Sequence, residues 1–75
     1  MEVSFDKVAN ALYLRFSNEK ILNSEEIANG IIVDYGKGDH VVSIEILNFS
    51  DRSLNLNDLI QMPVDEIIPL IVQCQ

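Results

Sequence analysis

The sequence predicts an α+β fold: a small antiparallel β-meander of about four strands, with a short helix and a partly extended C-terminal tail. Two features of the sequence lead to this prediction. Before Ser50, apolar and polar residues alternate in short runs, and a period of two is typical of strands with one buried face. After Ser50 this alternation is lost, and residues that begin and end helices appear instead.

The first two strands are predicted at residues 3–5 and 11–16, with turn-forming residues between them. The second strand alternates over its whole length. Leu12, Leu14 and Phe16 fall on one face, which we expect to be buried, because successive side chains of a strand point to opposite sides.

The mostly polar residues 17–29 are interpreted as a long connection, with or without one helical turn. The third strand follows at residues 31–35, where three successive β-branched side chains favour an extended backbone. Residues 36–39 contain two glycines, which can adopt the positive φ angles of a tight hairpin. This hairpin leads into the fourth strand at residues 41–47.

The C-terminal third is expected to contain one short helix, which Asn55 or Asn57 caps and Pro63 ends. A second helix over residues 64–72 would hold Pro69 in its interior, at a cost of about 3 kcal/mol. We therefore predict an extended or only partly helical tail, which lays its apolar side chains on the sheet or on a second subunit. The candidate interface residues are Ile67, Ile68, Leu70 and Ile71.

The chain is expected to form one small globular domain over residues 1–75. A domain of this size hides only about 60% of the surface of its unfolded chain, which leaves a thin core. Cys74 is the only cysteine, so a disulfide within the chain cannot supplement that core, and one His with one Cys does not provide a structural zinc site. We therefore expect a homo-oligomer or a protein partner.

The formal net charge of −7 argues against binding to DNA or RNA, because phosphate contacts require more Lys and Arg than the five in this chain. The charge favours a basic protein partner, although its simplest role is to keep a small apolar domain soluble. The first residues do not show the basic start and apolar stretch that are typical of a secretory signal, and no apolar tract reaches the length expected of a membrane crossing. We expect a cytoplasmic protein that binds neither nucleic acid nor a membrane.

Four sequence segments that overlap the predicted strands occur together in a known family. They are FD at residues 5–6, NALYLRF at 10–16, GIIVDY at 30–35 and VSIEIL at 42–47. In this order and spacing they resemble the short family known as domain of unknown function 2283, over about residues 3–50. The glycines at 36 and 38 depart from the family pattern, so the hairpin type is left open. The resemblance implies little about activity, but the occurrence of such families beside small toxin-like proteins implies an antitoxin-like role.

One group of polar side chains lies on the face opposite the apolar strand positions, and we call it the polar face. It consists of Tyr13, Arg15, Asp34, Ser43 and Glu45. An arginine between two carboxylates would orient an anionic ligand, and two acidic residues would divide acid and base roles. Cross-strand ion pairing explains the same residues without a ligand, each pair contributing about 0.2–1 kcal/mol.

The sequence assigns no catalytic residue, metal ligand or cofactor. No Ser or Cys has the neighbouring His and third residue of a nucleophilic site, and the glycines join two strands rather than a strand and a helix. The preferred hypothesis is a protein-interaction module, antitoxin-like, rather than an enzyme. The alternatives are a small enzyme or anionic-ligand-binding protein that uses the polar face, and a structural subunit of a homo-oligomer.

Overall fold

The computed structural model describes residues 1–73, and Cys74 therefore lies outside the described residues. Five strands form one antiparallel sheet, and two helices follow it in this part of the chain, which confirms the α+β class. The strands are β1 (Glu2–Asp6), β2 (Ala11–Arg15), β3 (Asn23–Ala28), β4 (Ile31–Tyr35) and β5 (Val41–Ile46). The helices are α1 (Leu56–Leu59) and α2 (Val64–Gln73), and short 3₁₀ turns cover Lys37–Asp39 and Phe49–Asp51.

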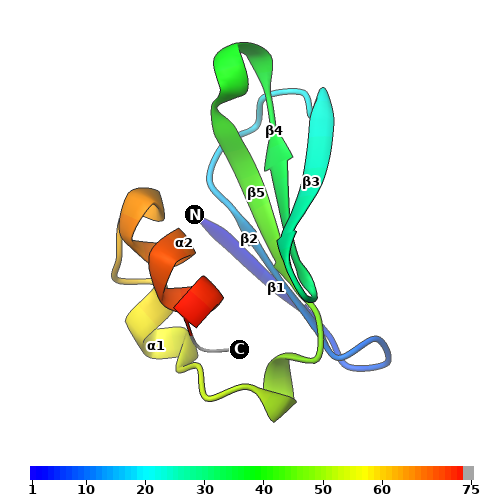
Figure 1. The fold of residues 1–75 in the computed structure, drawn as a ribbon, viewed down its shortest axis with the longest axis vertical. Coiled ribbons are helices and arrows are strands. Elements are labelled where there is room, and N and C mark those ends of the chain that lie inside the picture. The colour runs from blue at the N-terminus through cyan, green and yellow to red at the C-terminus, as the bar shows by residue number, and fades with distance from the viewer. Residues whose placement is uncertain (74–75) are drawn as a thin grey trace.

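The strands lie side by side in the order β1-β2-β5-β4-β3 (Figure 1). The sheet is therefore not the single meander that the sequence predicts, because a β1–β2 hairpin joins a β3–β4–β5 meander through the pairing of β2 with β5. Residues 16–22 connect β2 to β3 at the far edge of the sheet. Backbone hydrogen bonds of 2.8 Å hold both ends of this connection, from Phe16 N to Val42 O and from Leu22 N to Tyr35 O.

Strand β3 lies in the segment that the sequence analysis interpreted as a connection, and that interpretation is wrong. The strand pairs with β4 in a register that sets Ser24 opposite Asp34, with an irregularity between Glu26 and Ala28. Four of its six residues are exposed. Because this edge strand covers little of the core, it lacks the alternating apolar residues that identify β2 and β5.

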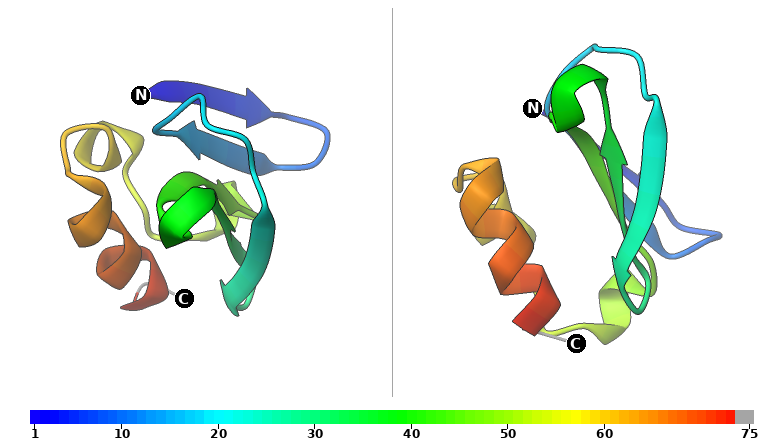
Figure 2. Two further views of the ribbon diagram at one scale, coloured as in Figure 1. Left: turned by 90° about the horizontal axis from the view of Figure 1, so that it is seen from above. Right: turned by 45° about the horizontal axis from the view of Figure 1, so that its top comes forward.

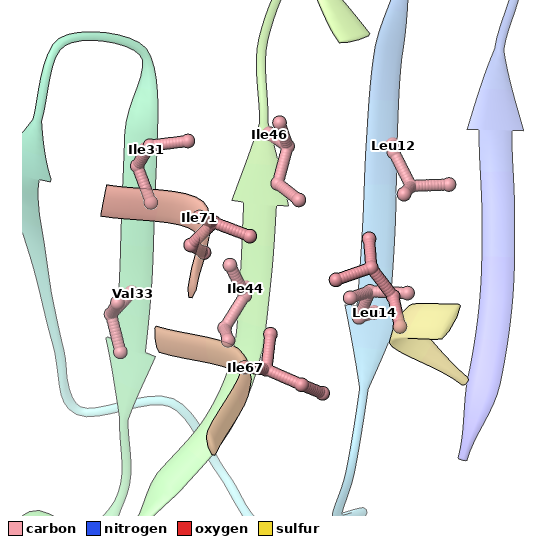
Figure 3. Packing of buried hydrophobic residues seen from close by; sticks show 9 residues of the cluster. Leu12, Leu14, Ile31, Val33, Ile44, Ile46, Ile67 and Ile71 are labelled. Atoms are coloured by element: carbon pink, nitrogen blue, oxygen red, sulfur yellow. The ribbon is translucent and has the colours of Figure 1, made fainter. Parts of the chain in front are cut away.

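Both helices lie on one face of the sheet and leave its other face uncovered (Figure 2). The core forms between these two layers, and its fully buried side chains come from three strands and both helices (Figure 3). Those that form one contiguous cluster are Leu12, Leu14, Ile31, Val33, Ile44, Ile46, Leu59, Ile67 and Ile71. The strand register places Leu12 opposite Ile46 and Leu14 opposite Ile44, so the predicted inward face of these strands is confirmed.

Helix α1 begins at the predicted cap. The Asn55 side chain accepts hydrogen bonds from the backbone N–H groups of Asn57, at 2.8 Å, and Asp58, at 3.4 Å. These bonds satisfy two of the amides that a helix leaves free at its start. The short helix places Leu59 fully in the core.

Helix α2 contradicts the prediction of an extended or partly helical tail. It is helical through Pro69, and its first turn is fixed by Pro63 O, which accepts from Glu66 N at 3.0 Å and from Ile67 N at 3.1 Å. One helical turn separates Ile67 from Ile71, and both side chains are fully buried. Burial contributes about 1.5–3 kcal/mol for each side chain, which offsets the cost of a proline in the helix.

The same burial corrects the candidate interface. Ile67 and Ile71 lie in the core of their own chain and are not available to a second subunit. Ile68 and Leu70 are half-buried and pack against that core. The C-terminal segment therefore completes the domain instead of forming an exposed apolar tail.

The β4–β5 turn is the glycine hairpin that the sequence predicts, but its two glycines serve different needs. Gly38 has a φ angle of +73°, a conformation that side chains disfavour. Gly36 is buried with a φ of −103°, and an added Cβ would lie 3.0 Å from Val42 Cγ2 and 3.3 Å from Lys20 O. Its lack of a side chain therefore lets the β2–β3 connection pack against the turn.

Arg52 joins two segments at the end of the sheet that lies opposite the β4–β5 turn. Its Nε donates to Leu47 O at 2.7 Å, and its Nη2 donates to Asn29 O at 2.8 Å. Gly30, between β3 and β4, leaves room for the guanidinium, since a Cβ there would lie 2.5 Å from Arg52 Nη2. The arginine thus links the β3–β4 turn to the end of β5.

Candidate functional site

The uncovered face of the sheet carries two rows of side chains that run across all five strands. The register of neighbouring strands defines them, because residues opposite one another share a face. In strand order from β1 to β3, the first row is Glu2, Arg15, Ser43, Asp34 and Ser24, and the second is Ser4, Tyr13, Glu45, Ile32 and Glu26. The structure thus places all five residues of the polar face on this side, three in the first row and two in the second.

Asp34 is fixed by a hydroxyl on each side. Ser24 Oγ donates to Asp34 Oδ1 at 2.5 Å, and Ser43 Oγ donates to Asp34 Oδ2 at 2.6 Å. Hydrogen bonds to an ionised carboxylate are shorter and stronger than neutral ones. The carboxylate is therefore held at one position in the row, with Ser43 itself only 7% exposed.

Ser24 is the member of this arrangement that the sequence analysis missed. It belongs to β3, which was interpreted as a connection, so no strand register was available to place it beside Asp34. The signal that was available is the alternation of Ser24 and Glu26, and it is short and contains no apolar partner residues.

Arg15 lies in the same row but is not part of an ion-pair network. Its Nη2 donates to the backbone oxygen of Glu19 at 3.3 Å. Among residues 1–73, the only side-chain contact at ion-pair distance joins His40 Nδ1, in the β4–β5 turn, to Glu19 Oε1, in the β2–β3 connection, at 3.8 Å, and it is an ion pair only when His40 is protonated. Cross-strand ion pairing therefore does not explain the polar face, and most of the guanidinium is free to bind another group.

In the second row, Tyr13 and Glu45 face each other across β2 and β5. The pKa of the Tyr13 phenol is raised above its usual value of 10.0, first because Glu45 accepts its hydrogen bond and second because the carboxylate is negatively charged. Glu45 therefore favours the protonated form of the Tyr13 hydroxyl.

The polar face is hollowed beside Arg15. A hollow of about 300 Å³ is lined by four of the five polar-face residues, Tyr13, Arg15, Asp34 and Ser43, together with Glu2, Ser4 and Ile21. Glu45 lies outside this lining. Ile21 comes from the β2–β3 connection, which therefore forms an apolar part of the wall. A smaller hollow of about 130 Å³ adjoins it and shares Glu2 and Arg15.

A second candidate site is the outer edge of the sheet at β1, which we call the β1 edge. All five residues of β1 are exposed. Val3 and Phe5 lie opposite Leu14 and Leu12, on the face that the helices cover, yet they remain 42% and 43% exposed. The rings of Phe5 and Phe49 meet edge-to-face, with centroids 6.1 Å apart. This edge offers free backbone groups beside exposed apolar side chains.

Residues 1–73 contain no cluster of three or more His, Cys, Asp or Glu side chains arranged to hold a metal ion. None of the helices in that range is both long and apolar enough to span a membrane.

The fold and these two surfaces define a small α+β domain with an open polar sheet face and an open sheet edge. Residues 2–50 match the model of the family described as "Protein of unknown function (DUF2283)", and the chain belongs to this family. The match covers the whole five-stranded sheet and stops before the two helices. No curated protein and no solved structure matches the chain significantly.

Proposed function

We propose that this domain is a protein-interaction module that accepts a strand of a basic partner at the β1 edge. The observation that carries the proposal is that β1 is an edge strand whose residues are all exposed, including Val3 and Phe5. An extended segment that adds to such an edge gains main-chain hydrogen bonds, while alternate side chains provide specificity.

The charge of the domain favours a basic partner. The chain carries a net charge of −7, and both ends of β1 are acidic, at Glu2 and Asp6. An added strand with apolar residues opposite Val3 and Phe5 and basic residues in between would match both faces of β1. An antitoxin-like role, in which this acidic domain covers a small basic protein, is one form of this function.

The same charges disfavour a second copy at this edge. If two β1 strands paired antiparallel around Ser4, each Glu2 would face Asp6 of the other copy. Like charges directly opposite one another destabilise a strand pair. A homo-oligomer formed through this edge is therefore the less favourable arrangement. Sedimentation of the isolated chain distinguishes a monomer from such an oligomer.

A pair of synthetic peptides tests the proposal. One alternates lysine and valine, and the other has the same composition with all lysines preceding all valines. We expect the alternating peptide alone to protect β1 amides from hydrogen exchange, and we expect its affinity to fall with added salt. Equal protection by both peptides, or protection by neither, would contradict the proposal.

A matched pair of variants controls for charge. Val3→Lys and Val8→Lys introduce the same side chain, but Val3 lies on β1 whereas Val8 lies in the β1–β2 turn and is 98% exposed. Val3→Lys should weaken binding of the alternating peptide by about tenfold or more. It removes an apolar contact and adds a positive charge that repels the lysines of the peptide. Val8→Lys should have a much smaller effect.

A further inference from the structure

The hollow on the polar face differs from the β1 edge in its chemistry, because it places a fixed cation and a fixed anion in one concave surface. We propose that it is a binding site for a small zwitterion, an α-amino acid with an apolar side chain, whose carboxylate binds Arg15 and whose ammonium binds Asp34. This inference goes beyond the proposed function, since the ligand is a small molecule and not a protein strand.

Arg15 is the carboxylate-binding group. Its guanidinium uses one donor in the bond to Glu19 O, at 3.3 Å, and lines both hollows. The remaining N–H groups form a planar fork that matches the two oxygens of a carboxylate. That bond also holds the arginine against the β2–β3 connection. The side chain therefore loses less conformational entropy when a ligand binds.

Asp34 is the ammonium-binding group. Its two oxygens each accept one serine hydroxyl, at 2.5 Å from Ser24 and 2.6 Å from Ser43. A carboxylate oxygen has a further lone pair after accepting one hydrogen bond. Asp34 can therefore accept from an ammonium without losing its serine partners, and those partners keep it from turning toward Arg15.

The register sets the spacing between the two groups. Arg15 and Asp34 both lie opposite Ser43 on β5, so they are two strands apart in the same row. Adjacent strands are about 4.8 Å apart, so the two backbones are separated by roughly 10 Å. The long arginine side chain shortens this gap, and a small molecule with both charges fits between the groups.

The surrounding charges decide between a zwitterion and a simple anion. Arg15 has Glu2 opposite it in register, Glu19 bonded through its backbone, and Asp34 in its row, within a chain of net charge −7. A single positive group in a row with two carboxylates, those of Glu2 and Asp34, does not make a site for a bare anion. A ligand that brings its own ammonium group neutralises part of this negative charge.

The hollow also sets the size and polarity of the ligand. Its volume of about 300 Å³ lies at the lower end of the range for small-molecule sites. Ile21 lines it and is 39% exposed, which provides an apolar surface for the ligand side chain. These features favour an aliphatic amino acid.

Three compounds that have the same side chain but differ in their charged groups test the proposal. They are L-leucine, which carries both charges, L-leucinamide, which lacks the carboxylate, and isocaproate, which lacks the ammonium. Each is titrated into the isotopically labelled full chain, and amide shifts are followed by NMR. We expect saturable shifts on β2, β4 and β5 with leucine, and affinities at least about tenfold lower for the other two. The absence of saturable shifts at millimolar leucine, or equal affinities for the three compounds, would overturn the proposal.

Two variants test which residue binds each charged group of the ligand. Arg15→Gln should remove the preference for leucine over leucinamide, and Asp34→Asn should remove the preference for leucine over isocaproate. Glu25→Gln is the control, because Glu25 pairs with Val33 and lies on the other face of the sheet. Binding of leucine by a folded Arg15→Gln chain with unchanged preference would refute the site. If Asp34→Asn does not fold, the comparison of the three compounds on the unaltered chain still decides the question.

Discussion

At the scale of single residues, the two serines that hold Asp34 differ in burial. Ser43 is nearly inaccessible to solvent, whereas Ser24 lies on the edge strand and is exposed. Water replaces a lost hydroxyl partner easily at an exposed position and poorly at a buried one. The two bonds to Asp34 should therefore contribute unequally to stability, although their lengths are nearly the same.

Ser43→Ala should lower the free energy of unfolding by about 1–2 kcal/mol, because it leaves one oxygen of Asp34 without its donor. Ser24→Ala should lower it by less than about 0.5 kcal/mol, since solvent reaches that oxygen. Urea denaturation of both variants beside the unaltered chain measures the difference. Equal losses would show that burial does not determine the strength of these bonds.

Tyr13 provides a pH-dependent test at the same scale. Glu45→Gln should lower the pKa of Tyr13 toward 10.0, because the neutral amide removes the negative charge that favours the protonated phenol. The absorbance of phenolate during an alkaline titration measures this pKa, and Tyr13→Phe identifies the signal. An unchanged pKa in Glu45→Gln would contradict the assigned cause.

The raised pKa also fixes the sign of the effect on stability. The folded state holds the Tyr13 proton more tightly than the unfolded state, whose pKa is near 10.0. The contribution is therefore present below that pH and is lost as the pH rises through the folded-state pKa. The loss should be smaller in Glu45→Gln.

Which residues share the polar face could be predicted, because alternation in β2, β4 and β5 determines the side on which each side chain lies. The contacts within that face could not. Two neighbours of the site, Ser24 and Ile21, come from residues 17–29, where apolar residues show no periodic pattern. The ion pairs expected around Arg15 also depend on side-chain reach across strands, which alternation does not specify.

At the scale of elements, the packing of α2 on the sheet overcomes the local free-energy cost of a proline in the helix. The sequence prediction gave decisive weight to Pro69 and so preferred an extended or only partly helical tail. The folded chain instead buries Ile67 and Ile71 against the sheet, and these contacts are invisible to local propensity. Strand β3 was missed for a related reason. Its backbone pairing with β4 stabilises the strand although it has no buried face, and such pairing leaves no periodic pattern in the sequence.

Pro69→Ala should stabilise the domain by about 1–3 kcal/mol. The exposed proline makes no core contact that alanine would remove, and alanine restores a backbone donor inside the helix. Part of the gain is offset because proline also restricts the unfolded chain. Urea denaturation and the helical circular dichroism signal measure the change, and a loss of stability would mean that α2 depends on the bend that proline introduces.

At the scale of the whole molecule, the net charge of −7 is spread over a domain in which carboxylates greatly outnumber cations. Within the described residues, the single contact at ion-pair distance joins His40 to Glu19 and is an ion pair only when His40 is protonated, so attraction between neighbours does little to offset repulsion. Repulsion between like charges destabilises a compact state and is screened by salt.

Moderate sodium chloride should therefore raise the melting temperature of the isolated domain relative to low salt. The measurement is a thermal unfolding series at fixed pH, with Glu25→Gln for comparison, because removal of one exposed carboxylate should reduce the response. A melting temperature that falls with salt would mean that favourable ion pairs dominate the charge interactions.

The order of the strands finally has a consequence for the folding pathway. The β3–β4–β5 meander and the β1–β2 hairpin each form from residues close in the chain, whereas β2 and β5 meet only across a long loop. Closing that loop costs entropy before its contacts form, so we expect the meander to assemble first and the hairpin to dock later. In stopped-flow experiments Val33→Ala on β4 should mainly slow folding, and Val3→Ala on β1 should mainly accelerate unfolding. The reverse pattern would place the nucleus in the hairpin.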